Sequence, residues 1–326
     1  MDRETPYAAL SPELVLDAVE AAGVRCSGHV LALNSYENRV YQIGVEAGEP
    51  VVVKFYRPGR WSDAAIGEEH GFAFELAAQE IPVVAPLLLD WVSLHLHAGF
   101  RYAVFPRRGG RWPELGTAEE REWVGRFLGR IHGVGRAGRF LHRPRLQVAD
   151  LGRNARDFVL QGDWMPDYLA DKYADVTEAL LEEVESRTDG WRGAAQLRIH
   201  GDCHRGNILW TDAGPHFVDL DDCQTGPAIQ DLWMLLAGGR QEMSAVLRDL
   251  VAGYEQFLPF DRGELALIEP LRALRMIHYS AWLARRWHDP AFPRAFPWFA
   301  EPRYWEEHYR ALDEQLGAVT GPPLEL

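Results

Sequence analysis

The sequence predicts an α+β protein of two lobes, in which a small five-stranded antiparallel sheet with one important helix precedes a larger helical lobe. Three observations predict this class. Strand-like segments are concentrated before residue 106, a Gly- and Arg-rich segment follows, and helical apolar spacing dominates the remainder. We therefore expect an N-terminal lobe at 1–105, a hinge at 106–110 and a C-terminal lobe at 111–326.

The first lobe begins with a predicted helix at 11–22, where Ser11 before Pro12 is typical of a helix start. Apolar runs bounded by turn residues predict five strands, at 29–33, 39–45, 51–56, 83–89 and 101–105. Residues 63–79 have the apolar spacing of a helix. This order predicts a sheet with one long helix inserted between its third and fourth strands.

The second lobe begins with a predicted helix at 118–132, where Thr117 and Glu120 form a capping box. A further helix is expected at 176–185, and the chain is mostly helical from Ile229 onward. Short strands are expected at 196–199, 208–210 and 216–218. Cofactor sites commonly lie between two such units, so we expect one here.

Composition excludes several classes of protein. The 326 residues carry a net charge of -14, which argues against a nucleic-acid binder because such a protein needs a basic surface. The apolar stretch 81–89 is too short to span a membrane, and the N-terminus lacks a signal-peptide pattern. Three scattered cysteines, Cys26, Cys203 and Cys223, indicate a reducing compartment. We expect a cytoplasmic protein.

The most informative segment runs from His200 to Asn207 and reads His-Gly-Asp-Cys-His-Arg-Gly-Asn. It places Asn207 five residues after Asp202, and Asp219 follows twelve residues later. Phosphoryl transfer from ATP uses such a set, in which one Asp accepts the hydroxyl proton and the Asn and second Asp hold Mg²⁺. A lone His-Gly-Asp would indicate only a turn or cap, but the linked Asn207 and Asp219 favour the catalytic interpretation.

The second acidic position has alternatives. We favour Asp219 as the metal ligand because it directly follows the apolar strand Phe217-Val218. Asp221 would share one strand face with Asp219 and is a second candidate metal contact, whereas Asp222 would face the opposite side. Asp231, at the start of an apolar helix, is expected to brace the catalytic loop.

Lys54 ends the apolar run Val51-Val52-Val53 and needs a compensating anion if it is buried. In a kinase that anion is an ATP phosphate, and a helix Glu holds the amine. We choose Glu69 over Glu68 for this partner. The alternative is an edge-strand lysine that reaches water.

The loop 34–38 joins the first two predicted strands, where a kinase folds a loop over the phosphates. Ser35 can offer its hydroxyl and backbone N–H to a phosphate, and Asn38 is a second candidate nucleotide contact. The loop lacks Gly-x-Gly-x-x-Gly, so an ordinary polar turn is the competing interpretation. Four late tryptophans are expected mainly in the core, with one or two lining an acceptor groove: Trp282, Trp287, Trp298 and Trp305.

These segments together resemble the aminoglycoside phosphotransferase and choline kinase-like branch of the protein-kinase-like fold. Within that branch the chain is similar to bacterial stress response kinases that act on Ser/Thr of proteins. The segments that carry the resemblance are 33–41, 53–58, 200–209, 217–222, 226–227 with 231–233, and 289–293. The His-Gly-Asp block indicates the superfamily, and the early and late segments are more specific.

The resemblance implies a bilobal kinase fold, Asp202 as proton acceptor, Asn207 and Asp219 as Mg²⁺ ligands, and Ser35 as an ATP contact. It also implies a cytoplasmic monomer linked to stress responses. Charge and composition, as above, predict no nucleic-acid or membrane partner. The chain departs from eukaryotic protein kinases because it has His-Gly-Asp for His-Arg-Asp and lacks Ala-Pro-Glu. How a peptide would dock therefore stays open.

The leading hypothesis is ATP- and Mg²⁺-dependent phosphorylation of protein Ser/Thr hydroxyls. The alternative is a small-molecule kinase for an amino alcohol, homoserine or an aminoglycoside, which would use the same residues. A third hypothesis, an ATP-binding module without activity, is disfavoured because a binder has no need for Asp202.

Overall fold

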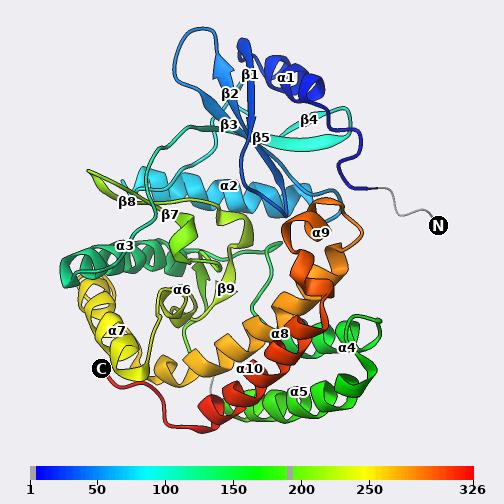
Figure 1. Cartoon of the computed structure of the whole chain (residues 1–326). Coiled ribbons are helices and arrows are strands. Elements are labelled where there is room, and N and C mark those ends of the chain that lie inside the picture. Colours follow the sequence, from blue (N-terminus) through cyan, green and yellow to red (C-terminus); the bar gives the residue numbers. More distant parts are fainter. Residues whose placement is uncertain (1–4, 189–193) are drawn as a thin grey trace.

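A five-stranded antiparallel sheet forms the smaller lobe in the computed structural model, which describes residues 5–188 and 194–326 (Figure 1). The strands follow the order β1-β2-β3-β5-β4, and every neighbouring pair is antiparallel. Their bounds are β1 (Cys26–Ala32), β2 (Arg39–Val45), β3 (Val51–Phe55), β4 (His95–His97) and β5 (Phe100–Pro106). The predicted five-stranded sheet is confirmed.

The two faces of this sheet contact different elements because side chains alternate along a strand. Val53 and Phe55 of β3 pack in one cluster with residues of α1 (Pro12–Ala21). On the other face, Ile66 of α2 (Asp63–Ala78) packs with Ala103 of β5. Lys54 points to this second face, so the alternation of β3 turns one charged side chain toward α2 and the larger lobe.

The strand predicted at 83–89 is wrong. This segment forms only isolated bridges, from Val83 to Phe217 and from Leu89 to Val92. Pro82 directly precedes it and Pro86 interrupts it, and proline has no N–H to donate to a strand ladder. The segment instead joins the two lobes, and the fourth strand is the short β4.

The larger lobe is mostly helical, as predicted. Its helices are α3 (Ala118–Ala137), α4 (Asn154–Leu160), α5 (Asp167–Thr188), α6 (Ile229–Trp233), α7 (Arg240–Tyr254), α8 (Ile268–Arg286), α9 (Ala291–Ala295) and α10 (Pro302–Thr320). The capping box of Thr117 and Glu120 at the start of α3 is confirmed. α3 and α5 extend beyond the predicted ranges, because buried faces continue past the clearest apolar spacing. None of the helices within the described residues is long and apolar enough to cross a membrane.

Two small two-stranded antiparallel sheets frame the segment with the His-Gly-Asp motif. β6 (Leu197–Ile199) pairs with β9 (Gln224–Gly226), and β7 (Ile208–Thr211) pairs with β8 (Gly214–Phe217). Short turns, η3 (Arg205–Asn207) and η4 (Leu220–Asp222), join them. The motif therefore lies on loops whose ends are fixed by strand pairing.

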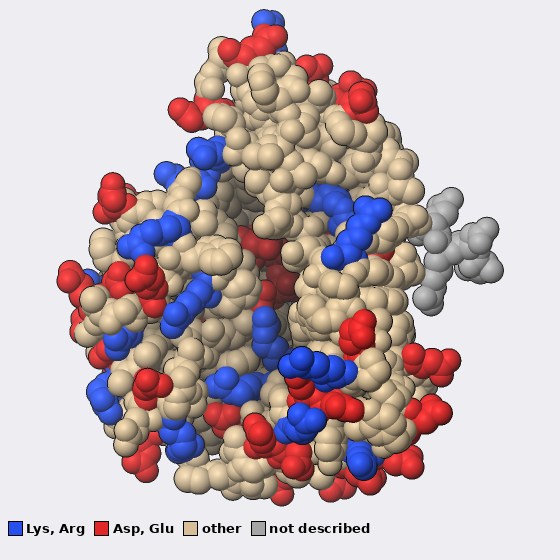
Figure 2. Space-filling model, in the orientation of Figure 1, with Lys and Arg blue, Asp and Glu red and all other residues tan. Residues whose placement is uncertain are grey.

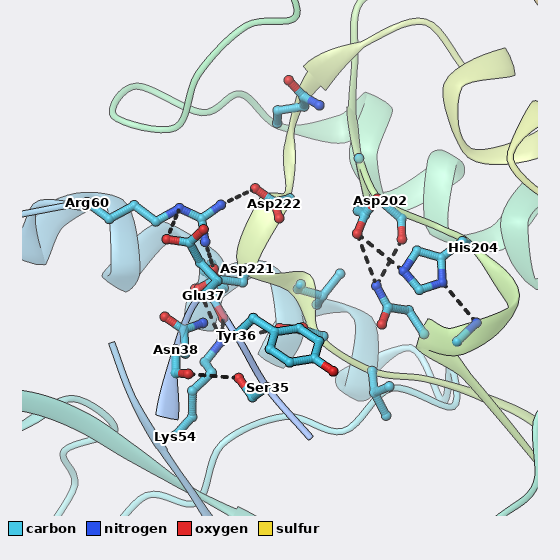
Figure 3. A pocket seen from close by; sticks show the side chains of 18 of the residues that line it. Ser35, Tyr36, Glu37, Asn38, Lys54, Arg60, Asp202, His204, Asp221 and Asp222 are labelled. Carbon is cyan, nitrogen blue, oxygen red and sulfur yellow. Dashed lines mark hydrogen bonds and ion pairs between the residues drawn. The ribbon is translucent and has the colours of Figure 1, made fainter. Parts of the chain in front are cut away.

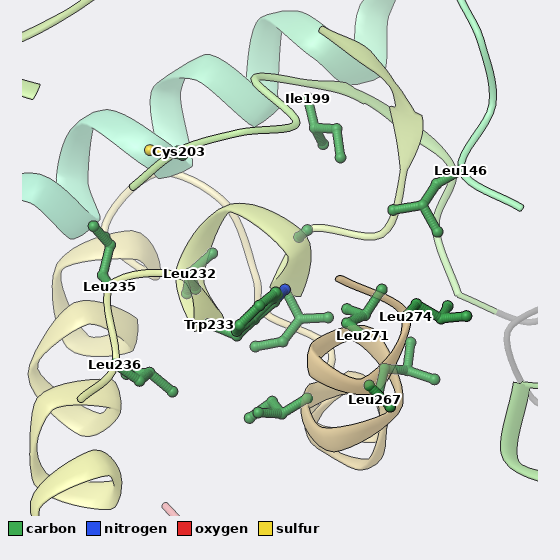
Figure 4. Packing of buried hydrophobic residues seen from close by; sticks show 14 of the residues in the cluster. Leu146, Ile199, Cys203, Leu232, Trp233, Leu235, Leu236, Leu267, Leu271 and Leu274 are labelled. Carbon is green, nitrogen blue, oxygen red and sulfur yellow. The ribbon is translucent and has the colours of Figure 1, made fainter. Parts of the chain in front are cut away.

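Close helix packing and a large apolar core hold these loops in place. A Cβ on Gly125 of α3 would lie 2.0 Å from the Leu250 carbonyl oxygen of α7, so the close approach of these helices requires glycine. Figure 4 shows the core around α6, where Leu232 and Trp233 lie near Leu271 of α8. This core supports the motif loops.

Candidate active site

A cleft of about 1120 Å³ lies between the two lobes. Its lining includes residues of the 34–38 loop, β3, α2, the His-Gly-Asp loop, η4 and α8. Figure 2 shows the hollow between the lobes, with acidic side chains on its floor and Lys and Arg side chains near its rim. The candidate residues from distant parts of the sequence therefore share one cavity.

Lys54 is buried in this cleft and surrounded by acids. Its Nζ lies 2.7 Å from Glu69 Oε1 of α2, 3.4 Å from Asp221 Oδ1 and 3.7 Å from Asp219 Oδ1. Burial alone would lower the pKa of the Lys54 ammonium, but the nearby carboxylates raise it well above its ordinary value. The site therefore keeps a positively charged ammonium inside the cleft.

Glu68, the alternative partner of Lys54, makes other contacts. Its carboxylate accepts hydrogen bonds from three consecutive backbone N–H groups at 141–143, at 2.6, 2.8 and 2.8 Å. Burial opposes ionisation of Glu68, but these hydrogen bonds lower its pKa below the ordinary value. The structure thus brings Glu69, and not Glu68, to Lys54.

Asp231 braces the start of the motif loop. Its buried carboxylate accepts the backbone N–H groups of His200 and Gly201 at 2.7 and 2.8 Å, and it lies 3.0 Å from His132 Nε2. His200 in turn donates through Nε2 to the Val218 carbonyl at 2.9 Å. Both histidines are therefore structural hydrogen-bonding residues, and Asp231 fixes the backbone directly before Asp202.

Gly201 is required by the same loop. Its φ is 85°, in the left-handed region, and an added Cβ would lie 2.2 Å from the Asp222 carbonyl oxygen. Glycine avoids both the strained backbone and the collision. The loop can therefore pass close to η4, which brings Asp202 near the acids that follow β8.

Asp202 lines the cleft and is held by two basic side chains. Arg275 Nη1 of α8 donates to Asp202 Oδ1 at 2.8 Å, and His204 Nε2 lies 3.5 Å from Oδ2. Burial opposes ionisation, but the contacts with His204 and Arg275 lower the pKa of Asp202 far below its ordinary value. Asp202 is therefore a carboxylate at neutral pH.

Asn207 and Asp219 both present oxygen atoms to the cleft. Asn207 Nδ2 donates to the Asp202 carbonyl at 3.0 Å, and no hydrogen bond to its amide oxygen is found within 5–188 and 194–326. The Asp219 side chain is 51% exposed and contacts Lys54 at 3.7 Å. Its backbone is left-handed, with φ 60°, a conformation that Asp tolerates better than most residues. These are hard oxygen donors that suit Mg²⁺.

The prediction that Asp219 and Asp221 share one face of a strand is wrong. β8 ends at Phe217, and residues 220–222 form the turn η4, so strand alternation does not apply. Asp221 is buried against Lys54 and Arg60, and Arg60 also pairs with Asp222 (Figure 3). Asp219 is thus the carboxylate that stays most open to the cleft.

The loop 34–38 covers one side of the cleft (Figure 3). Ser35 Oγ donates to the Asn38 carbonyl at 2.9 Å, and Asn38 Oδ1 accepts the Arg57 N–H at 3.1 Å. Tyr36 packs edge-on against Phe296 at a ring distance of 4.8 Å. Ser35 and Asn38 line the cleft, but both also stabilise the loop itself.

Glu37 ties this loop to α8. Its Oε2 accepts a hydrogen bond from Trp282 Nε1 at 2.7 Å and lies 2.5 Å from Arg286 Nε. Its Oε1 lies 3.0 Å from Arg57 Nε of the smaller lobe. One acidic side chain therefore joins both lobes beside the predicted phosphate loop.

Asp289, between α8 and α9, forms a second link between the lobes. Its two oxygens each accept from Arg39 Nη2 at 3.0 Å, and Oδ2 also accepts from Arg57 Nη2 at 2.7 Å. The acid is 2% exposed. Together with Glu37 it fixes the position of the smaller lobe against α8 and α9.

Sequence reasoning missed Arg60, Arg275 and Glu37. Arg275 belongs to a stripe on α8 with apolar or aromatic neighbours at spacings of three and four, which indicates a shared face. No sequence signal placed that face beside Asp202. Arg60 and Glu37 lie in loops, where no periodicity indicates which way a side chain points.

The cysteines and late tryptophans take mainly structural positions. Cys203 and Cys223 are buried, and burial raises the pKa of both thiols, which disfavours the reactive thiolate. Trp305 is buried in the core, whereas Trp282 lines the cleft. Trp287 is partly buried against the same core, but Trp298 is 39% exposed, so the prediction of mainly core tryptophans is confirmed only in part.

Comparison with known proteins identifies the family. Residues 29–268 match the phosphotransferase enzyme family. Stress response kinase A of Salmonella choleraesuis (strain SC-B67) is 46% identical over 326 residues, covering 100% of this chain and 98% of that protein. The chain belongs to the phosphotransferase enzyme family. Within that family it groups with the stress response kinases, and it is a kinase.

Further relatives of this phosphotransferase have consistent names. Serine/threonine protein kinase RdoA of Salmonella typhimurium is 45% identical and covers 100% of this chain and 98% of that protein. Stress response kinase A of Escherichia coli (strain K12) is 45% identical, covering 98% of this chain and 97% of that protein. Both matches extend over nearly the whole kinase.

Solved structures show that the phosphotransferase fold is shared. Amicoumacin kinase hAmiN, in complex with AMP-PNP, Ca2+ and Ami, aligns with a TM-score of 0.71 at 19% identity over 95% of this chain and 96% of that chain. The microcompartment-associated aminopropanol kinase aligns at 0.69 and 18% identity over 94% and 98%. At such identities the likeness concerns the fold alone.

Proposed function

We propose that this kinase transfers the γ-phosphoryl group of ATP to Ser/Thr hydroxyls of proteins as part of a stress response. The observation that carries the proposal is the meeting of Asp202, Asn207, Asp219 and Lys54 around one cleft. The names of relatives about 45% identical over nearly their whole length support a protein substrate and a stress role. The proposed boundaries are 1–105 and 111–326, with a hinge at 106–110.

Asp202 is the proposed proton acceptor. The acceptor hydroxyl oxygen forms a bond to Pγ while the bond from Pγ to the β,γ-bridging oxygen breaks. The hydroxyl proton passes to Asp202, and ADP leaves. The lowered pKa of Asp202 suits positioning of the hydroxyl, because a loose transition state requires little proton removal before transfer.

Asn207 and Asp219 are the proposed Mg²⁺ ligands. Their amide and carboxylate oxygens are hard donors, and few protein ligands suffice because Mg²⁺ is commonly held partly by substrate phosphates and water. When bound, the ion would neutralise phosphate charge.

Lys54 is the proposed contact to the ATP phosphates, and Glu69 orients its ammonium from 2.7 Å. Ser35 and Asn38 are proposed contacts from the loop 34–38, where the Ser35 hydroxyl can turn from the Asn38 carbonyl toward a phosphate oxygen. Lys54 is buried but lines the cleft, and its contacts with Glu69 and Asp221 hold the ammonium there for a phosphate to bind.

The test is transfer from labelled ATP with Mg²⁺ to a Ser/Thr-containing protein and to a panel of amino alcohols. The wild type should label protein, and Asp202→Asn should lose at least about 100-fold in kcat while retaining ATP binding. A matched control is Asp157→Asn, which changes a half-exposed acid on α4 outside the cleft. Wild-type turnover in Asp202→Asn would overturn the role of Asp202.

The second candidate is a small-molecule kinase, since structures of this fold include an aminopropanol kinase and an amicoumacin kinase. Label on an amino alcohol, with none on protein, would leave the proposed roles of the catalytic residues unchanged. It would show that the acceptor is a small alcohol and not a protein.

A further inference from the structure

One face of α8 forms the wall of the cleft beside Asp202. The residues that line the cleft recur at helical spacing, so they share this face. They are Leu271, Arg275, His278, Tyr279, Trp282 and Arg286. The acceptor must bind where its hydroxyl reaches Asp202, so this face of α8 is positioned to contact the rest of the acceptor.

Arg275 is the residue on this face that lies nearest to the proposed base. Its Nη1 donates to Asp202 Oδ1 at 2.8 Å, and its side chain is 46% exposed. The guanidinium has five N–H donors, and Asp202 is its one ion-pair partner among the described residues. The remaining donors can therefore bind a second anion while Arg275 stays paired with Asp202.

The charges of the neighbouring groups are largely paired. Arg60 pairs with Asp221 and Asp222, and Arg286 lies against Glu37. When an acceptor hydroxyl binds Asp202, the carboxylate keeps its charge and its pair with Arg275, but the guanidinium donors that do not contact Asp202 stay open to the cleft.

His278 lies on the same face of α8, close to several guanidinium groups. Its pKa is lowered to about 4, first by burial and then by the nearby guanidinium groups of Arg285, Arg286 and Arg275. His278 is therefore neutral at pH 7.

The reach of Arg275 limits where the anion can be. A hydroxyl bound to Asp202 lies about 2.7 Å from the carboxylate, and Arg275 lies 2.8 Å from the same group. Arg275 binds Oδ1, so a hydroxyl bound to either carboxylate oxygen lies within about 8 Å of the guanidinium. A carboxylate on a residue next to the acceptor Ser or Thr can span this distance and meet the planar guanidinium.

We propose that Arg275 selects an acidic acceptor, in which a carboxylate adjacent to the phosphorylated Ser or Thr binds the guanidinium while the hydroxyl binds Asp202. The stacked rings of Tyr279 and Trp282, 5.8 Å apart and 14° from parallel, offer an apolar surface for the same peptide. The inference rests on the proposed protein-kinase function and adds the charge of its substrate.

The test compares peptides that differ only beside one Ser, with Glu or Lys at the neighbouring positions. The full chain should phosphorylate the Glu peptide with a kcat/KM about tenfold higher, which is the size of one hydrogen bond to a charged group. Arg275→Ala should bring the ratio near one, Arg275→Glu should invert it, and Arg275→Lys should retain part of it. The KM for ATP should change little.

Arg310→Ala is the matched control, because Arg310 is an exposed arginine on α10 outside the cleft. It should leave the tenfold preference intact. A wild-type preference for the Lys peptide would overturn the inference. An equal loss on both peptides in Arg275→Ala would also overturn it, since Arg275 would then only position Asp202.

Failure of the proposed function gives a different result. If small alcohols accept phosphate and peptides do not, the protein-kinase proposal fails. A comparison of homoserine with 3-aminopropanol then tests the anion preference separately, because the two differ by one carboxylate. A higher kcat/KM for homoserine that Arg275→Ala removes would support recognition of an anion, and a higher value for 3-aminopropanol would overturn it.

Discussion

Asp231→Asn should uncouple the motif loop from the core of the larger lobe while keeping the volume of the side chain. The carboxylate is 0% exposed and accepts three hydrogen bonds, from His200 N–H, Gly201 N–H and His132. The amide retains one oxygen and presents an NH₂ group to at least one of these donors. One or two buried donors then lose their partner.

Each unsatisfied buried donor costs about 1–3 kcal/mol, so the free energy of unfolding should fall by about 3 kcal/mol. That loss is within the usual stability of a folded protein, about 5–15 kcal/mol, and the variant should still fold. The larger effect should be on kcat, because Asp202 follows the two anchored N–H groups directly. A shift of about 1 Å at a catalytic group can lower the rate about 100-fold.

Urea unfolding measures the first effect, and steady-state kinetics with separate ATP-binding measurements test the second. The expected variant has a kcat about 100-fold lower and an ATP Kd within about threefold of wild type, because Lys54 lies on β3 and does not contact Asp231. Asp157→Asn, on the surface of α4, should change the unfolding free energy by under about 0.5 kcal/mol. A fully stable variant, or parallel losses of kcat and ATP affinity, would refute the bracing role.

Three further changes test other contacts. Glu264 is buried with its pKa raised from 4.5 to about 7, so its protonated form is favoured on folding. The stability that it contributes is present below pH 4.5 and is lost as pH rises past 7. The free energy of unfolding of the wild type should therefore fall by about 3 kcal/mol over that range, and Glu264→Gln should lack this fall when urea unfolding is measured at several pH values. Glu69→Gln should weaken the hold on Lys54 and lower kcat at least about tenfold, and unchanged kinetics would contradict the pairing. Asp289→Asn should cost about 3 kcal/mol of stability, because it leaves buried Arg57 less well paired; a thermal midpoint equal to wild type would contradict the link between the lobes.

The extent of prediction from sequence differed between elements. The helix at 63–79 and the strand at 39–45 were predictable, because an amphipathic period or a short apolar run is a local property. The segment 83–89 was not, because its apolar residues pack between the lobes while Pro82 and Pro86 prevent a continuous ladder. Apolar content alone does not distinguish these two outcomes.

The candidate site shows the same division. Asp202, Asn207 and Asp219 were predictable as a set because their order and spacing lie within one short stretch of chain. The choice between Glu68 and Glu69 was not, since the two are adjacent on α2 and their directions depend on what packs against that helix. The structure separates them, with Glu69 at Lys54 and Glu68 at backbone N–H groups.

By itself the sequence determined the two-lobed α+β class, the kinase motif and most of the residues proposed to act on ATP, because each depends on spacing along the chain. Only the tertiary structure decided that Arg275 of α8 forms an ion pair with Asp202. It also decided that the pairs of Glu37 with Arg286 and of Asp289 with Arg57 join the lobes. These partners are 73, 249 and 232 residues apart. Contacts over such separations depend on how whole elements pack, and no local pattern of residues encodes them.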